Sequence, residues 1–343
     1  MIQHLLPVPA PADAPPGRAL PPALGEHLAD PATRAALRIQ DIVVDAARRH
    51  LREGGFVELL PPTIGPVTDP GGRGSKQVDI DFYGHRYKLM SSAILYKQAA
   101  LLAFDKVFSI APNVRLEPIE TRHTGRHLVE FHQIDVEVAG ASYGEAMALA
   151  EELVAACVRR VVTEAGTELE ILGRDPNAFT DLLVNGFDVM SHTEAVDRLR
   201  ALGHPQSSDA EIDWVAEELL SRQARRPFFI SDYPKGSRGF YDRESRTTPG
   251  RLENFDLIAP EGYGELVSGS QREADYPRVI SRIRESGENP AKYGWYLDLM
   301  RQGAIPGSAG FGLGAQRFTR YLAGVASVWQ ATAFPKLPGL RSA

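Results

Sequence analysis

Two polar segments of this 343-residue chain carry the side chains best suited to bind a phosphorylated ligand. The first segment contains Arg115 and Glu117 and is followed by a polar loop at 118–129 with two arginines and two histidines. From Glu130 onward, polar and apolar residues alternate. A planar guanidinium group can donate two parallel hydrogen bonds to a phosphate. We interpret the segment as two strands joined by a cationic loop that faces a polyphosphate. A charged surface hairpin without a ligand is the alternative.

The second segment is glycine-rich, spans 307–314 and precedes Arg317 in the first turns of a predicted helix. Glycine lets a backbone approach a ligand closely, and the amino end of a helix favours an anion. This segment lacks the spacing of a dinucleotide fingerprint, and the segment 71–76 lacks the glycine-lysine-hydroxyl ending of a P-loop. The sequence therefore argues against a Rossmann or P-loop enzyme.

The elements that must position these segments predict an α+β fold, with an antiparallel sheet flanked by helices. Short β-forming segments, including a hairpin at 78–89, alternate with groups of helices such as 34–53, which differs from the regular order of a doubly wound fold. The proline-rich residues 1–33 are expected to form an extended arm. Residues 34–343 are expected to form the catalytic domain, with a polar helical insertion at about 185–225.

Composition narrows the function classes. The formal net charge is −6 and the sequence has no block of basic residues, which argues mildly against a protein whose main ligand is a polyanion. The single cysteine, Cys157, excludes an internal disulfide and a thiolate-rich metal site. No apolar run is long enough to cross a bilayer, and the amino terminus lacks the basic start of a signal peptide. We expect a soluble, cytoplasmic protein without a membrane partner.

Three segments, in this order, resemble the three signature motifs of the class II aminoacyl-tRNA synthetases. They are the helix 34–53 with the following strand and Pro62, the segment around Arg115, and the glycine-rich segment before Arg317. The resemblance extends over almost the whole chain and is closest to the aspartyl/asparaginyl subgroup. It implies the antiparallel class II catalytic fold, and a homodimer whose interface lies at the first motif.

The resemblance also implies a site for ATP and Mg²⁺. Arg115 would hold the α-phosphate together with a substrate carboxylate oxygen, and Arg317 would hold the γ-phosphate, so both are implied catalytic residues. Glu117 would contact the adenine amino group, and Phe131 would stack beneath the adenine ring. The other implied residues are His127 and Gly314 at the nucleotide, and Glu265 and Ser268 as Mg²⁺ ligands with Asp256 as an outer ligand.

The substrate prediction depends on the segment Ser-Ser-Ala-Ile-Leu-Tyr-Lys-Gln at 91–98. In aspartyl enzymes of the subgroup the equivalent lysine meets the aspartate side chain; Lys97 takes that place, with Arg272 as second partner and Asp135 orienting Lys97. Two cations favour a dicarboxylate over its neutral amide. Ile94 and Pro70 replace the family's groups beside the α-ammonium. The residues expected to bind there instead are Asp69, Ser92 and Gln133.

The acceptor prediction depends on the start of the chain. Members of the subgroup that charge tRNA carry an anticodon-binding barrel of about a hundred residues before the core, whereas about 33 residues precede it here. This arrangement resembles the archaeal-type asparagine synthetase related to these synthetases. We therefore predict an asparagine synthetase that activates L-aspartate as aspartyl-adenylate and amidates it with ammonia, without tRNA. The alternatives are another amine or an aspartate analogue, aminoacylation of tRNA or a carrier, and a paralogue without catalysis.

Overall fold

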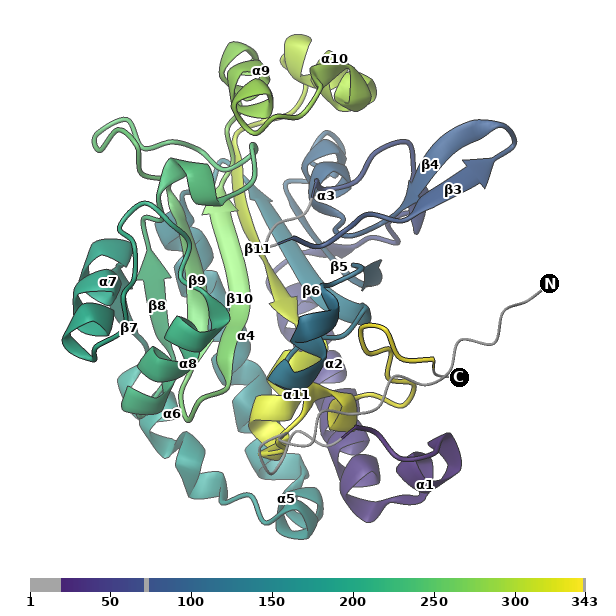
Figure 1. Cartoon of the computed structure of the whole chain (residues 1–343), viewed down its shortest axis with the longest axis vertical. Coiled ribbons are helices and arrows are strands. Elements are labelled where there is room, and N and C mark those ends of the chain that lie inside the picture. Colours follow the sequence, from purple (N-terminus) through teal and green to yellow (C-terminus); the bar gives the residue numbers. More distant parts are fainter. Residues whose placement is uncertain (1–19, 71–73, 342–343) are drawn as a thin grey trace.

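An eight-stranded sheet organises the residues that the structure, a computed structural model, describes: 20–70 and 74–341 (Figure 1). Every neighbouring pair from β5 to β8 is antiparallel, and the edge pairs β1–β5 and β7–β8 are parallel. The predicted α+β fold with an antiparallel sheet is therefore confirmed. In spatial order the strands are β1 (Val57–Glu58), β5 (Lys106–Val114), β6 (Glu130–Ala139), β11 (Ser308–Gly314), β10 (Gly264–Gln271), β9 (Asn254–Ala259), β8 (Phe228–Ser231) and β7 (Asp188–Ser191).

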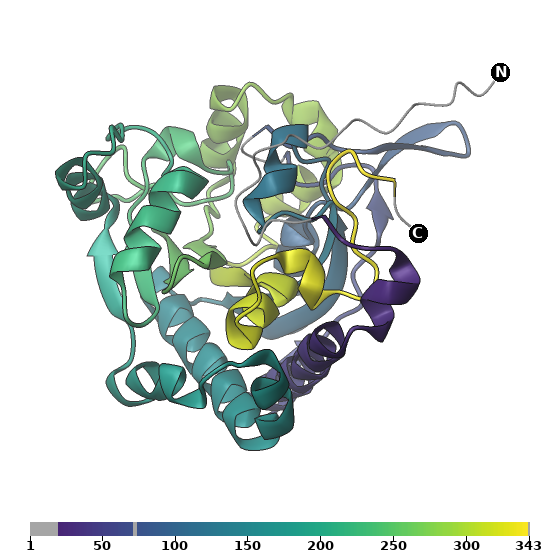
Figure 2. The ribbon, with the colours of Figure 1, turned by 60° about the horizontal axis from the view of Figure 1, so that its bottom comes forward.

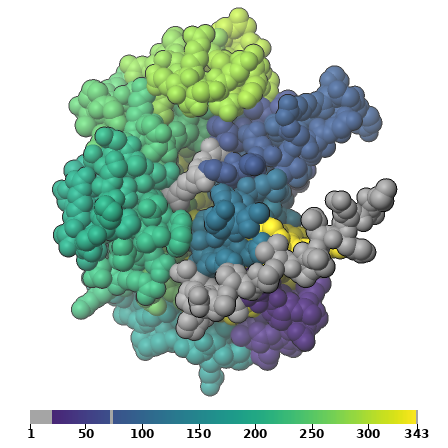
Figure 3. Space-filling view, in the orientation of Figure 1, coloured from purple at the N-terminus to yellow at the C-terminus, as the bar shows by residue number. Residues whose placement is uncertain are grey.

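A smaller sheet carries the predicted hairpin. It consists of β2 (Ile64–Gly65), β4 (His85–Leu89) and β3 (Asp79–Phe82), and the β3–β4 hairpin projects from the body (Figure 3). Gly84 adopts a φ of 83° in the connecting turn, a conformation that glycine tolerates without strain. The sheet edge at β1 leads to Leu60, which is 95% exposed; the homodimer contact expected in this region stays a prediction.

Two long helices cover one face of the large sheet, and they pack side by side beneath it, purple and teal in Figure 2. The first, α2 (Pro31–Glu53), begins where the Asp30 carboxylate accepts hydrogen bonds from two backbone amides, and it buries an apolar stripe. The second, α4 (Tyr143–Glu164), begins at a capping box formed by Ser142 and Glu145. Cys157 of α4 faces this core, where burial raises the pKa of its thiol to about 12.

The other helices surround the sheet edges and its open face. Short 3₁₀ turns connect several of them. No helix in the described part of the chain has the length and apolar character needed to cross a membrane. The remaining helices are α1 (Leu24–Ala29), α3 (Ile94–Ala100), α5 (Gly166–Leu172), α6 (Thr180–Asn185), α7 (His192–Ala201), α8 (Trp214–Gln223), α9 (Tyr276–Glu285), α10 (Gly294–Arg301) and α11 (Ala315–Ala323).

The structure differs from the predicted elements in the amino-terminal arm and in the helical insertion. Residues 1–19 of the predicted arm lie outside the described residues, but 24–29 form α1, whose buried His27 hydrogen-bonds to the Thr332 carbonyl at 2.8 Å. The expected helical insertion at 185–225 contains α7 and α8 but also β7, an edge strand of the main sheet.

The glycine-rich segment 307–314 contributes a central strand of the main sheet, β11 (Ser308–Gly314). Its even-numbered residues Gly310, Gly312 and Gly314 pair with Glu137, Asp135 and Gln133 of β6. On the opposite face of the same strands, apolar side chains pack into the helical core. Because side chains alternate along a strand, one face of the sheet is apolar and the other carries a polar row that the glycines accommodate. Glycine is unfavourable in strands by propensity, and here the neighbouring polar side chains override that preference.

Replacing Gly310 with alanine should destabilise the fold. A Cβ at this position would overlap the Val136 carbonyl oxygen and the Glu137 carboxylate. Crowding of this kind costs about 1–3 kcal/mol, which urea unfolding would measure. Gly144→Ala, at the open start of α4, is the matched control, because alanine is the better helix former there. Equal stability of the two variants would contradict the packing role of Gly310.

Candidate functional site

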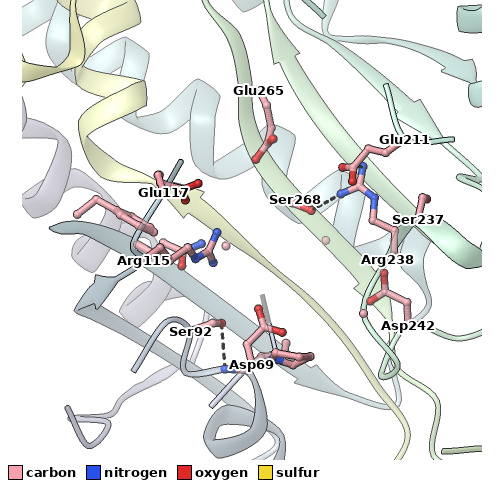
Figure 4. Close-up of a pocket in the computed structure, with 18 of the residues that line it drawn as sticks. Asp69, Ser92, Arg115, Glu117, Glu211, Ser237, Arg238, Asp242, Glu265 and Ser268 are labelled. Atoms are coloured by element: carbon pink, nitrogen blue, oxygen red, sulfur yellow. Dashed lines mark hydrogen bonds and ion pairs between the residues drawn. The ribbon is translucent and has the colours of Figure 1, made fainter. Parts of the chain in front are cut away.

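The polar face of the sheet forms the floor of a pocket of about 890 Å³ (Figure 4). Its walls come from α3, from the segments that follow β5 and β8, and from the starts of α8 and α11. Every residue predicted for the site except Asp256 lines this pocket. These residues are Asp69, Ser92, Lys97, Arg115, Glu117, His127, Phe131, Gln133, Asp135, Glu265, Ser268, Arg272, Gly314 and Arg317.

Arg115 and Phe131 lie together at the end of the β5–β6 pair. The guanidinium carbon of Arg115 is 5.2 Å from the centroid of the Phe131 ring, and its Nε donates to the Ser91 carbonyl at 3.0 Å. This contact orients the planar group while leaving its terminal nitrogens toward the pocket, where Figure 4 shows Glu117 beside it. The arrangement offers an aromatic face, a carboxylate and a guanidinium group to one ligand.

Arg317 reaches the pocket from the first turns of α11, directly after Gly314. Its Nη1 lies 3.2 Å from a carboxylate oxygen of Glu265, and its Nε donates to the Arg126 carbonyl at 3.2 Å. His127, from the cationic loop, has its Nδ1 2.6 Å from the Thr124 hydroxyl. The two predicted cationic segments therefore converge on the same pocket.

Lys97 and Arg272 are buried and already paired. The Lys97 ammonium donates to Asp135 at 3.0 Å and to the carbonyls of Phe311 and Val136 at 3.1 and 3.3 Å, which uses all three protons. Arg272 makes a two-pronged contact with Glu137, both nitrogen–oxygen distances being 3.0 Å. Burial opposes the charge on Arg272, but Glu137 outweighs burial and raises the pKa of this guanidinium group.

This pairing corrects the charge argument for a dicarboxylate. Asp242 lies 3.6 Å from Arg272, so three carboxylates, Asp135, Glu137 and Asp242, surround the two cations. The group carries a net charge of −1 (two cations against three carboxylates) and offers no surplus positive charge to a substrate carboxylate. Both cations hold carboxylates of the pocket floor, and their contact with a substrate carboxylate stays a prediction.

One acceptor in this floor is unsatisfied. Asp135 is 2% exposed, and its second oxygen, Oδ2, has no hydrogen-bond partner among the described residues. A buried carboxylate oxygen without a donor is costly. Because Asp135 lines the pocket, a ligand that donates an N–H there would remove this cost.

The residues expected near an α-ammonium group line the same pocket. Asp69 accepts a hydrogen bond from the Tyr241 hydroxyl at 3.1 Å. Ser92 accepts from the Ile94 amide at 3.2 Å, and Gln133 accepts from the Asn113 amide at 2.8 Å. Burial, followed by the nearby carboxylates, raises the pKa of Tyr241, which keeps this hydroxyl a donor to Asp69.

Glu265 and Asp256, two of the three predicted metal ligands, belong to an acidic group. One carboxylate oxygen from each, and one from Glu217 of α8, lie within 4.8 Å of one another. Carboxylate and hydroxyl oxygens are the ligand types that Mg²⁺ prefers, so the donor set fits this ion. Asp256 itself is fully buried below the pocket lining, and Glu217 forms an ion pair with Arg126 at 2.5 Å.

Sequence reasoning missed Arg238 and Glu211, which line the pocket, and Glu137 and Glu217, which lie buried beside it. Glu137 has a recognisable signal, because it continues the alternation of Gln133 and Asp135 along β6. Arg238, Glu211 and Glu217 come from irregular or helical segments and carry no local pattern. The tertiary path of the segments that connect β7 to β8 and β8 to β9 brings these three residues to the site.

The comparisons with known proteins agree with this geometry. The family model for class II tRNA synthetases (D, K and N) matches residues 26–338. The asparagine–tRNA ligase of Thermococcus kodakarensis is 35% identical over 312 residues, covering 91% of this chain and 71% of the relative; that of Thermus thermophilus is 37% identical over 309 residues, covering 88% and 69%. The structure of Pyrococcus horikoshii asparaginyl-tRNA synthetase with asparaginyl-adenylate matches with a TM-score of 0.87 and 32% identity, covering 93% of this chain and 72% of that one.

These relatives contradict two predictions. A tRNA-independent asparagine synthetase that uses aspartate and ammonia is wrong as the main interpretation, because the similar proteins are named asparagine–tRNA ligases. The expectation that tRNA is not a partner is wrong for the same reason. That prediction depended on the length of the segment before the core, which is not sufficient evidence about the acceptor. The family match over 26–338, together with 35% identity over 71% of a relative's length, shows that this chain belongs to the class II tRNA synthetases of the aspartate, lysine and asparagine group.

Proposed function

We propose that this enzyme activates asparagine with ATP, forming asparaginyl-adenylate and pyrophosphate, and transfers the asparaginyl group to a tRNA. The observation that carries the proposal is the continuity of one pocket from the arginines expected at ATP, Arg115 and Arg317, to the polar floor around Asp135. The similarity to asparagine–tRNA ligases supports the same amino acid and the same acceptor.

The polar floor supports an amide rather than an acid. Asp135 Oδ2 is a buried acceptor without a donor, and an asparagine side chain supplies an N–H. Arg272 uses three of its five N–H groups on Glu137 and Ser270, so a guanidinium N–H remains for the amide oxygen. Aspartate would instead bring a fourth carboxylate to a group that already has a negative balance.

Each side chain then has a role in the reaction. The α-carboxylate of the amino acid attacks the α-phosphorus, the bond to the β-phosphate oxygen breaks, and pyrophosphate leaves. Arg115 would neutralise charge that develops at the α-phosphate, and Arg317 would hold the departing phosphates. Glu265, Ser268 and Asp256 would hold Mg²⁺, which stabilises negative charge on the leaving group when bound. A ribose hydroxyl of the tRNA then attacks the activated carbonyl, and AMP leaves.

Pyrophosphate exchange tests the activation step, and charging tests the acceptor. With ATP and Mg²⁺, asparagine should support exchange with a much higher kcat/KM than aspartate, and radiolabelled asparagine should then appear on tRNA. Binding of tRNA should weaken steeply as salt rises, because contacts to phosphates release counterions. Exchange that requires aspartate would overturn the choice of amino acid. Pyrophosphate exchange with asparagine, but no transfer of asparagine to any tRNA in an extract of total tRNA, would overturn the choice of tRNA as acceptor.

Asp135→Asn should change which amino acid is activated. The variant replaces the acceptor-only oxygen with an amide that can donate to a substrate carboxylate, so the ratio of kcat/KM for asparagine over aspartate should fall by about 10- to 100-fold. Steady-state exchange with both amino acids measures the ratio. Asp81→Asn, at an exposed position of strand β3 in the hairpin, is the control and should leave the ratio unchanged. An unaltered ratio in Asp135→Asn would remove this residue from substrate selection.

A further inference from the structure

One arginine at the pocket already contacts groups that the proposed function assigns to Mg²⁺. Arg238 follows the 3₁₀ turn Lys235–Ser237 between β8 and β9. Its Nη2 lies 2.5 Å from one carboxylate oxygen of Asp256, and its Nη1 lies 3.2 Å from the other oxygen and 3.3 Å from the Ser268 hydroxyl. Figure 4 shows the guanidinium group of Arg238 reaching Ser268 from the wall that faces Arg115.

The guanidinium group is also fixed from the sides away from Asp256. The Glu211 carboxylate lies 3.2 Å from its Nη2, and its central carbon lies 4.0 Å from the centroid of the Tyr233 ring. The side chain is only 11% exposed. A buried, forked contact of this kind holds a carboxylate in a defined orientation.

The acidic group of Glu217, Asp256 and Glu265 is already paired with arginines. Each of its three carboxylates has an arginine partner: Arg126 for Glu217, Arg238 for Asp256 and Arg317 for Glu265. Arg317 Nη1 lies 3.2 Å from one oxygen of Glu265, and Arg238 contacts both oxygens of Asp256. Arg238 therefore occupies lone pairs of Asp256 that a metal ion would need.

We infer that Arg238 is a tethered cation that competes with a divalent metal ion for Asp256 and Ser268. A metal ion needs the same oxygen lone pairs at about 2.0–2.6 Å and is repelled by an adjacent guanidinium group. The negatively charged triphosphate of ATP would attract Arg238 and bring its own oxygen ligands to the ion. The nucleotide-free protein should thus bind a divalent ion weakly at this site, and metal binding should be coupled to the nucleotide. This inference rests on the proposed function only for the presence of a metal during activation.

The test measures Mn²⁺ binding to the nucleotide-free protein by electron paramagnetic resonance of the free ion, so it does not depend on amino acid activation. Arg238→Gln should bind Mn²⁺ at least about tenfold more tightly than the unchanged protein. Arg243→Gln is the matched control, because Arg243 lies on the same segment but does not line the pocket. Its Nε lies 3.2 Å from a carboxylate oxygen of Glu253. It should bind Mn²⁺ like the unchanged protein.

A double variant assigns the gain to the correct ligand. Adding Asp256→Asn to Arg238→Gln should return the Mn²⁺ affinity to the original level and also restore the local charge balance. Should Arg238→Gln fail to fold, Arg238→Lys keeps the charge but loses the fork and should show an intermediate affinity. The inference is overturned by equal Mn²⁺ affinity in the folded Arg238 variant and the unchanged protein, or by a gain that persists in the double variant. Failure of asparagine activation alone would leave these binding results unaffected and would bear only on the proposed function.

Discussion

Arg115→Gln is expected to reduce pyrophosphate exchange by about 10²- to 10³-fold, the loss typical when one donor to a developing anion is removed. The structure places this guanidinium group against Phe131, with one hydrogen bond to the Ser91 carbonyl. Glutamine keeps a donor for that carbonyl but cannot neutralise an α-phosphate. The loss should therefore appear in the rate of exchange, while the melting temperature changes little.

The matched control for this variant is Arg86→Gln. Arg86 lies on the exposed hairpin, where it pairs with Asp79 far from the polar floor. Its exchange rate should equal that of the unchanged protein. Exchange by Arg115→Gln within threefold of this control would exclude a direct role of Arg115 at the phosphate.

Glu137→Gln is expected to cost about 3–5 kcal/mol in the free energy of unfolding, the usual result of leaving a buried cation without its partner. Glu137 is fully buried and accepts two hydrogen bonds from Arg272 and one from Ser308 at 2.8 Å. Lys97 lies 3.5 Å from the same carboxylate. Urea unfolding measures the loss, and Glu164→Gln in an exposed helical ion pair should cost less than about 1 kcal/mol.

The same carboxylate should make stability depend on pH. Burial opposes the ionised form, but the cations Arg272 and Lys97 outweigh it and hold the pKa of Glu137 below its ordinary value of 4.5. Its contribution is complete above pH 4.5 and is lost as the pH falls through the lower pKa of the folded state. Unfolding free energies measured from pH 7 to pH 3 should fall less steeply in Glu137→Gln. Parallel slopes in the two proteins would show that the pKa of Glu137 does not change on folding, which would contradict this assignment.

The sequence predicted the fold class from local patterns, and it predicted most of the pocket residues through the resemblance of its motifs to those of the class II synthetases. Alternation along β6, the helical pattern at 34–53 within α2 and the hairpin at Gly84 are all read from neighbouring residues. The strand β11 escaped prediction, because its glycines are explained only by the side chains across the sheet.

The substrate prediction failed for a related reason. Lys97 and Arg272 are correctly placed in the pocket, but the charge they present depends on Glu137 and Asp242, which are distant along the chain. A lysine or arginine identified in a sequence can be neutralised by a buried carboxylate in the folded protein. Its partners, and therefore its selectivity, come from tertiary contacts that no local pattern records.

The row of glycines in β11 has a consequence for how such an enzyme can acquire a new substrate. Because Gly310, Gly312 and Gly314 contribute no side chains, the residues that contact a substrate on this face come mainly from β6 and β10. A substitution at position 133 or 135 can therefore alter selectivity while the apolar face and its helices remain untouched. Selectivity on this face can change at a few positions of β6 and β10 without a change in the helical core.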